Sequence, residues 1–496
     1  MKYVSTRNKA IEVTSSYAIA HGISEEGGLF VPNYIPKLSK DDFETIKALK
    51  YNERAKYILK NFLTDFSEDE LDYCVNGAYI GTFDEDKPAP LHTLTKGVNI
   101  LELWHGPTCA FKDLALQILP YLLTTSAKKE SKGKKIVILV ATSGDTGKAA
   151  LEGFKDVADT EIIVFYPCDG VSKMQKLQMD SQKGNNVNVF SIKGNFDDAQ
   201  SGVKKIFTDN DFKAELDKNG MQFSSANSIN WGRLAPQIIY YVSAYCDMLA
   251  KGEDLTNGFN VVVPTGNFGN ILAAYYAKEM GVPVNKLICA SNANNVLTDF
   301  INTGVYDRNR KFFTTVSPSM DILISSNLER MLFHLTDGDD AYISEIQNNL
   351  ANDGKFTVND TVKLRLQDLF YGGCCDDRQT LKTISETFEK YGYLCDTHTA
   401  VAVNVYNQYK EKTGDNRPVV IASTASPYKF AGSVLGAIKT DASADEFANI
   451  DELSVATKTE IPTPISALKT AEVRFKETYE KTDMLNAVCK ALGIMK

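Results

Sequence analysis

Residues 136–154 read IVILVATSGDTGKAALEGF, an unbroken apolar run that ends in a turn of small residues and continues at once as a helical pattern. A buried parallel strand that leads into a helix has this pattern. The turn directs backbone N–H groups and the positive end of the helix to one place, which favours an anion. The spacing excludes a nucleotide P-loop, because Gly144 and Gly147 enclose two residues and Lys148 precedes Ala149. The alternative interpretation is a plain strand-to-helix turn without a ligand.

The composition is that of an ordinary globular protein. With 496 residues, the chain is long enough for two or three domains. It carries 54 basic and 63 acidic residues and no basic tract, so we expect neither a nucleic acid nor a membrane as partner. The N-terminus lacks an apolar signal segment, and no apolar stretch of about 18 residues occurs, so we expect a cytoplasmic protein.

Cysteine and histidine spacing gives no metal signal. The nine cysteines form no CxxC pair, and the five histidines are scattered. The sequence therefore predicts neither a disulfide framework nor a metal centre.

Alternating strand and helix patterns follow residue 136, which predicts an α/β fold with doubly wound parallel sheets. Helical periodicity in 41–80 predicts an N-terminal helical cap. Residues 300–380 are polar and weakly periodic, so we expect an insertion or lid region there.

A second glycine-containing loop, PTGNFGN at 264–270, follows the apolar run FNVVVP. Gly266 and Gly269 allow the backbone to approach an anion, Asn267 and Asn270 add side-chain donors, and a helical pattern begins at once. The sequence therefore predicts a phosphate-binding loop, although a turn without a ligand has the same composition.

Lys112 lies in an unusually apolar setting. Between Leu103 and Ala127 only Lys112 and Asp113 carry fixed charges, and a helical pattern starts at Lys112. Burial and the positive helix end both disfavour the ammonium, which favours an amine nucleophile. The alternative is a lysine that extends from a surface helix into water. A buried amine together with a phosphate-binding loop suggests pyridoxal phosphate.

Eight motifs in order resemble threonine synthase, in the branch without an N-terminal S-adenosylmethionine domain. They are STRN (5–8), GGLFVP (27–32), FKD (111–113), ATSGDTGKAA (141–150), GNFDDA (194–199), NSINWGR (227–233), PTGNFGN (264–270) and STASPYKF (423–430). The resemblance implies a tryptophan-synthase-β-like fold, which is fold type II of the pyridoxal-phosphate enzymes. It also implies a lyase of threonine biosynthesis, and a monomer is the commoner state of this branch.

The resemblance further implies a division of the chain. We expect an N-terminal cap domain at 1–92, a small mobile α/β domain at 136–212, and a large cofactor-binding domain at 93–135 and 213–496.

The cofactor residues are carried over from the resemblance. Lys112 matches the Schiff-base and catalytic lysine, and Thr424 matches the group beside the pyridine nitrogen. The loop for the cofactor phosphate consists of Gly266, Asn267, Phe268, Gly269 and Asn270.

The implied substrate is O-phospho-L-homoserine, which water converts to L-threonine and phosphate by γ-elimination and β-addition. The candidate substrate-binding residues for its carboxylate and phosphate are Ser143, Gly144, Thr146, Lys148, Asn195, Asn230 and Arg233. Without the resemblance, Arg233 fits a salt bridge at a helix start and Asn195 a turn equally well.

Two positions depart from the wider pattern. Asp145 stands where many fold type II enzymes have Asn, and we expect it to cap the following helix or to order the loop. Ser426-Pro427-Tyr428 stands where the branch usually has His-Pro-Ala.

Two other functions compete with this interpretation. A threonine dehydratase or cysteine synthase lacks the STR and GGLFVP region. A phosphate-ligand-binding module without activity has no need of a buried amine such as that expected at Lys112.

Overall fold

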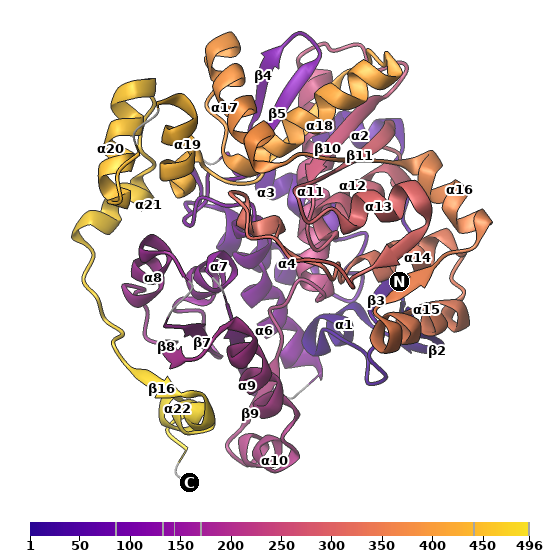
Figure 1. Cartoon of the computed structure of the whole chain (residues 1–496). Helices are drawn as coiled ribbons and strands as arrows, with labels where there is room; N and C mark the ends of the chain where they lie inside the picture. The colour runs from indigo at the N-terminus through magenta and orange to yellow at the C-terminus, as the bar shows by residue number, and fades with distance from the viewer. Residues whose placement is uncertain (85–86, 131–132, 143, 169–170, 440–441, 495–496) are drawn as a thin grey trace.

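The computed structural model describes residues 1–84, 87–130, 133–142, 144–168, 171–439 and 442–494. Its described part contains two larger sheets, one of six strands and one of five (Figure 1). Helices cover both, so the chain is an α/β protein.

The six-stranded sheet has the order β14-β11-β10-β15-β5-β4. Its strands are β4 (Leu91–Thr95), β5 (Val98–Glu102), β10 (Phe259–Pro264), β11 (Val284–Ser291), β14 (Phe370–Cys374) and β15 (Val419–Ser423). All neighbours pair in parallel except β4 and β5, which are antiparallel at one edge. β10 is buried along its whole length, as expected for a strand covered on both faces.

The five-stranded sheet is parallel throughout and has the order β16-β8-β7-β6-β9. Its strands are β6 (Lys135–Ala141), β7 (Thr160–Pro167), β8 (Val187–Lys193), β9 (Met221–Ser224) and β16 (Thr478–Glu480). Thus the expected small domain at 136–212 omits two strands of this sheet. β9 and β16 are only four and three residues long, and neither is an apolar run that the sequence pattern could reveal.

The arrangement of the apolar core explains why both faces of the five-stranded sheet are covered. In β6, Ile136, Ile138 and Val140 face one cluster, whereas Val137 and Leu139 face another. The second cluster is closed by α9 (Phe196–Thr208), α10 (Asn210–Lys218) and the C-terminal α22 (Met484–Leu492). The first cluster also contains residues of β10 and β15, so the two sheets share one core.

Helices between and around the sheets complete the layers. They are α5 (Asp113–Leu116), α6 (Leu119–Glu130), α7 (Asp145–Phe154), α8 (Lys173–Asp180), α11 (Trp231–Ala250), α12 (Gly269–Glu279), α13 (Val296–Thr303), α17 (Asp377–Tyr391), α18 (Thr397–Thr413), α19 (Ala431–Ile438), α20 (Glu446–Thr457) and α21 (Thr463–Ser466). In the described part of the chain, no helix combines the length and the apolar character needed to cross a membrane.

The N-terminal region is not purely helical. It contains α1 (Ser15–His21), α2 (Lys40–Ala48), α3 (Tyr51–Leu59) and α4 (Glu68–Tyr79), together with the antiparallel sheet β2 (Asn8–Val13), β1 (Tyr3–Ser5) and β3 (Phe30–Pro32). The STRN and GGLFVP motifs form part of this sheet, and short strands of this kind give no helical period.

Residues 300–380 are more regular than expected. They contain the hairpin β12 (Val305–Asp307) and β13 (Lys355–Thr357), and the helices α14 (Leu328–Leu335), α15 (Asp340–Asp353) and α16 (Asp360–Leu369). The region ends in β14, which forms one edge of the six-stranded sheet. In α14 the charged side chains of Glu329 and Arg330 are buried together with the apolar ones, so this helix lacks the polar outer face that produces a clear helical period.

Candidate active site

The site lies where loops leave the carboxyl ends of β5, β6, β10 and β15, as expected for a parallel sheet. The loop after β5 carries Lys112, directly before α5. It is held against the end of β15, because the Phe111 N–H donates to the Thr424 carbonyl (2.9 Å) and the Ser426 N–H donates to the Cys109 carbonyl (3.0 Å). Lys112 and Thr424, 312 positions apart, are therefore brought together.

Lys112 is partly buried, and charged groups of both signs act on its amine. Burial lowers the pKa of Lys112, the carboxylate of Asp145 raises it, and the cations Lys429 and Arg233 lower it further. The net effect is a pKa below the usual lysine value, which increases the fraction of neutral amine at a given pH.

Asp113 shapes the loop that presents Lys112. Its carboxylate accepts from the Thr108 N–H (2.8 Å) and from the Thr108 hydroxyl (2.7 Å). Burial raises the pKa of Asp113 to about 6 although these hydrogen bonds act against it. A side chain at Gly106 would collide with Asp113, so glycine is required where the loop passes this carboxylate.

The loop Gly266–Asn270 has the geometry of an anion site. Phe268 adopts a left-handed conformation (φ 63°) and α12 begins at Gly269, so the first-turn amides have no acceptor within the helix. The side-chain amide oxygen of Asn270, Oδ1, accepts hydrogen bonds from the hydroxyls of Tyr240 and Tyr241, both at 2.6 Å. Its Nδ2 is buried and has no partner among the described residues. Asn267 is exposed, with its carbonyl bound to the Asn327 N–H (3.1 Å).

In the loop before α7, two backbone N–H groups are already hydrogen-bonded within the loop itself. The Thr142 hydroxyl accepts from the N–H groups of Gly144 and Gly147, both at 3.0 Å. Gly144 has φ 145°, and a side chain there would overlap the amide of Gln175. Thr146 is partly exposed on the first turn of α7, and Ser143 lies outside the described residues.

Three of the candidate substrate-binding side chains already have protein partners. Lys148 donates to Glu152 (3.0 Å) and to Gln182. Asn195 is exposed and caps α9 by accepting from the Asp198 N–H (2.9 Å). Asn230 caps α11 and is buried, with Nδ2 bound to two backbone carbonyls. Their role toward a substrate stays a prediction.

Arg233 is different, because part of its guanidinium remains available. Nη1 donates to the Ala226 carbonyl (2.8 Å), whereas Nε is buried without a partner among the described residues. Burial lowers the pKa of Arg233 to about 10, so the group is still a cation at neutral pH. The described contacts of Arg233 include no salt bridge at the helix start.

Asp145 has a role that sequence reasoning left open. It is the first residue of α7, but the structure gives no side-chain cap there. Instead its carboxylate pairs with Lys429 (Nζ to Oδ1, 3.1 Å) and accepts from Gln175 (3.2 Å) and from the Ser319 hydroxyl (3.3 Å). Burial alone raises the pKa of Asp145, but Lys429 and Lys112 lower it far below the usual range. Of the two expected roles, ordering the loop agrees with these contacts.

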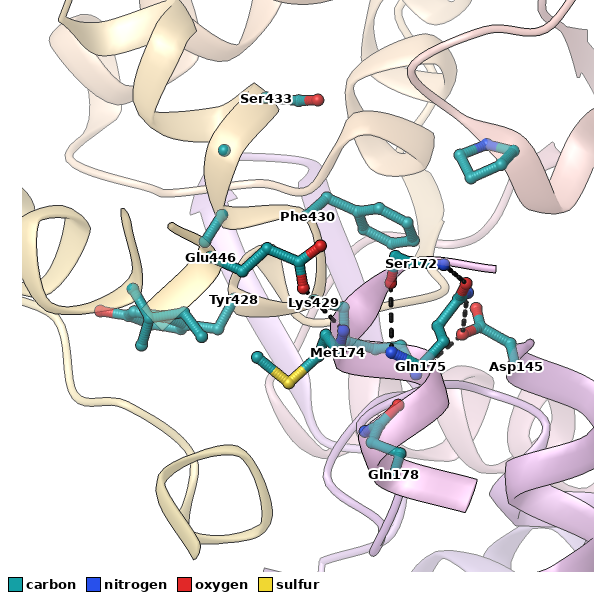
Figure 2. Close-up of a pocket in the computed structure, with 14 residues that line it drawn as sticks. Asp145, Ser172, Met174, Gln175, Gln178, Tyr428, Lys429, Phe430, Ser433 and Glu446 are labelled. Carbon is teal, nitrogen blue, oxygen red and sulfur yellow. Dashed lines mark hydrogen bonds and ion pairs between the residues drawn. The ribbon is translucent and has the colours of Figure 1, made fainter. Parts of the chain in front are cut away.

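A cavity of about 260 Å³ adjoins the Asp145–Lys429 pair. It lies between α8 on one side and α19 and α20 on the other, and Figure 2 shows Gln175 between Ser172 and Asp145 at its edge. Sequence reasoning missed Gln175 and Lys429. Lys429 stands within the motif STASPYKF, so its position between apolar residues was a visible signal.

The residues present fit pyridoxal phosphate. The cofactor needs an amine for its aldehyde and an anion site for its phosphate, and Lys112, whose pKa is lowered, and the start of α12 fit these needs. The unpartnered Nδ2 of Asn270 is a further donor beside that loop.

Comparison with known proteins gives three consecutive family matches. The models for the threonine synthase N terminus, for pyridoxal-phosphate-dependent enzymes and for the threonine synthase C-terminal region match residues 2–79, 86–352 and 399–489.

Relatives and solved structures agree. A threonine synthase of Pseudomonas aeruginosa is 36% identical over 88% of this chain and 90% of its own length. Human threonine synthase-like 1 is 42% identical over 86% of this chain, which spans 58% of that longer protein. The crystal structure of a PLP-bound threonine synthase from Brucella melitensis matches with 34% identity and a TM-score of 0.89 over 100% of both chains. The chain therefore belongs to the threonine synthase family of pyridoxal-phosphate-dependent, fold type II enzymes.

Proposed function

We propose that this chain uses pyridoxal phosphate to convert O-phospho-L-homoserine and water to L-threonine and phosphate. The observation that carries the proposal is the partly buried amine of Lys112, whose pKa is lowered, near a buried cation, Arg233, with an unused donor. Such a pair can move a proton at one end of a phosphorylated amino acid and stabilise its leaving phosphate at the other.

In this proposal the loop Gly266–Asn270 binds the cofactor phosphate at the start of α12, where amides and the helix dipole favour an anion. When bound, pyridoxal phosphate supplies an aldehyde for amines and an electron sink for the reacting carbon atoms. Thr424, whose carbonyl accepts from the N–H of Phe111 next to Lys112, carries a hydroxyl instead of a carboxylate and so would add no negative charge beside the cofactor ring.

Lys112 acts as the general base and acid. Its Nζ removes the α-proton of the substrate and then one proton from the β-carbon, and it later returns one proton to the γ-carbon, which becomes a methyl group, and one to the α-carbon. Phosphate leaves from the γ-carbon, and the hydroxyl of water adds to the β-carbon. Burial supports this role because it lowers the pKa of Lys112 and so increases the fraction of neutral amine at a given pH.

Arg233 is the proposed ligand of the leaving phosphate. A guanidinium presents planar donors to phosphate oxygens, and the free Nε of Arg233 is available for such a bond. The substrate carboxylate is proposed to bind at the start of α7. Because Thr142 occupies the amides of Gly144 and Gly147, the Thr146 segment and Ser143 are the proposed remaining donors.

The proposal extends to a monomeric enzyme of the cytoplasm. The monomer is carried over from the resemblance to the threonine synthase branch described above. Cys246 and Cys289 are buried as thiols, in agreement with a reducing compartment.

The test is the release of phosphate and threonine from O-phospho-L-homoserine by the purified protein with pyridoxal phosphate. Equal release of both products is expected. If the protein releases neither product but still binds the cofactor, as seen by its visible absorbance, then its substrate is a different one within the wider class of pyridoxal-phosphate enzymes. Activity on free serine or threonine alone would favour a dehydratase.

A further inference from the structure

Asp145 and Lys429 form an ion pair that joins the part of the chain around the five-stranded sheet to the part around the six-stranded sheet. Asp145 begins α7, beside the five-stranded sheet, and Lys429 lies in the 3-10 turn η3 (Pro427–Phe430) after β15 of the six-stranded sheet. Their side chains are only 8% and 3% exposed. A buried ion pair loses so much hydration that it is weak evidence for a stabilising role. The position of the pair, rather than stability, gives the clue to its role.

Lys429 also contacts the segment that carries Lys112. Its Nζ donates to the Thr108 carbonyl (2.9 Å), and Thr108 is itself held by both oxygens of Asp113. The ammonium of Lys429 therefore lies between the Asp145 carboxylate and the loop that presents the Lys112 amine.

Four charged side chains act on Lys112, and each comes from a different element. Asp145 belongs to α7, Asp113 to α5, Arg233 to α11 and Lys429 to η3. The oxygens of Asp113 are engaged by Thr108, and among the anions Asp145 affects Lys112 most.

A carboxylate beside an amine favours the protonated ammonium, which cannot accept a proton. Without a counter-charge, Asp145 would therefore oppose the use of Lys112 as a base. Gln175 and Ser319 fix the carboxylate by hydrogen bonds but supply no charge, whereas Lys429 does.

We propose that Lys429 is a positioning residue that engages the Asp145 carboxylate and thereby keeps Lys112 available as the base. This inference rests on the proposed function, because it gives a role to a residue that does not itself react. Asp145 in turn ties the start of α7 to the six-stranded sheet, so the charge balance at Lys112 depends on how the two domains meet.

The test uses two substitutions that remove opposite members of the pair. In Lys429→Met, a side chain of similar length without charge, Asp145 is no longer balanced, and the pKa of the Lys112 nitrogen should rise by about one unit. In Asp145→Asn, which keeps the shape and an acceptor for Lys429, the same pKa should fall by about one unit. Lys429→Arg is the matched control and should leave the pKa close to that of the unchanged protein.

Two measurements report this pKa. The first is the pH titration of the visible absorbance of the cofactor in the holoenzyme, since Lys112 holds the cofactor in the proposed function. The second is competitive labelling of amines over a pH series in the full chain without cofactor, with the Lys112 peptide quantified by mass spectrometry. The second needs neither cofactor nor substrate, so it separates this inference from the proposed reaction.

Opposite shifts in the two variants are the expected result, and a purely structural role does not produce them. Shifts of the same sign, or no shift in variants that keep their circular dichroism and Tm, would overturn the proposal. Should Lys429→Met fail to fold, Asp145→Asn decides alone: an unchanged or raised pKa of Lys112 refutes the assignment. If the protein without substitutions releases no threonine, the proposed reaction is refuted, but the proposed charge balance at Lys112 is not.

Discussion

Replacing Arg233 with lysine keeps a positive charge but removes the Nε donor that has no partner among the described residues. In the proposed reaction this donor bonds to the phosphate as it leaves. Arg233→Lys also removes the Nη1 bond to the Ala226 carbonyl (2.8 Å), so some loss of stability is expected as well.

The magnitude follows from the burial of the site. A hydrogen bond between charged groups contributes about 1.5–3 kcal/mol, and charge that develops in a water-excluded transition state is stabilised at least this much. We therefore expect kcat/KM for O-phospho-L-homoserine to fall roughly 10- to 100-fold, mostly through kcat. Burial lowers the pKa of Arg233 to about 10, so the unchanged protein keeps the cation throughout a neutral assay.

The assay is phosphate release at saturating cofactor, with kcat and KM determined separately. Arg54→Lys is the matched control, because Arg54 is also buried but pairs with Asp247 and bonds to several backbone carbonyls of the N-terminal region. The control should lower Tm and leave kcat/KM of the folded protein unchanged. If Arg233→Lys leaves both kcat and KM unchanged, the phosphate assignment is wrong.

Three further changes test other parts of the structure. Gly144→Ala should lower kcat/KM at least about 10-fold at a nearly unchanged cofactor affinity, because φ 145° strains any residue with a side chain and the Gln175 amide would have to move away from the loop. Steady-state kinetics and a cofactor titration measure the two quantities. Tyr241→Phe removes one hydrogen bond to Asn270 and should weaken cofactor binding about 5-fold, measured by fluorescence titration; an unchanged Kd would place the cofactor elsewhere. Burial lowers the pKa of His334 to about 4, so the unfolded chain binds a proton that the folded chain does not as pH falls from about 6.5 to 4, and roughly 3 kcal/mol of stability should be lost in that window. Urea unfolding of His334→Gln should lack this part of the pH dependence; an unchanged slope would contradict the assignment.

The strands that the sequence reveals are those whose side chains are buried on both faces. IVILVA is a continuous apolar run, and FNVVVP is apolar except for Asn260, because alternate residues enter different core clusters. These runs located β6 and β10. β9 and β16 are short and partly exposed, and β16 comes from the far C-terminal end of the chain. Their membership of the small sheet depends on pairing between distant segments, which local periodicity does not record.

For the candidate site, too, the sequence indicates some residues directly and leaves others undetermined. Lys112 and the two glycine loops have local signatures: an isolated charge in an apolar stretch, and a turn between a strand and a helix. The state of each donor has no such signature. The Thr142 hydroxyl accepts from two N–H groups of its own loop. Asn230 caps α11 with its Oδ1 and donates from Nδ2 to two backbone carbonyls, whereas the Nε of Arg233 has no partner among the described residues. These differences arise from neighbours that only the folded chain supplies.

The same distinction explains why Asp145 could not be interpreted from its motif. In the sequence it is one residue of SGDTGK, where a carboxylate at a helix start suggests a cap. In the fold its partners Lys429 and Ser319 are 284 and 174 positions away, and both lie outside the small sheet. A carboxylate that raises the pKa of a base lowers its reactivity unless a cation balances it, so Asp145 and Lys429 are expected to be functional only as a pair. Replacing one of them alone should therefore disturb Lys112 more than replacing both.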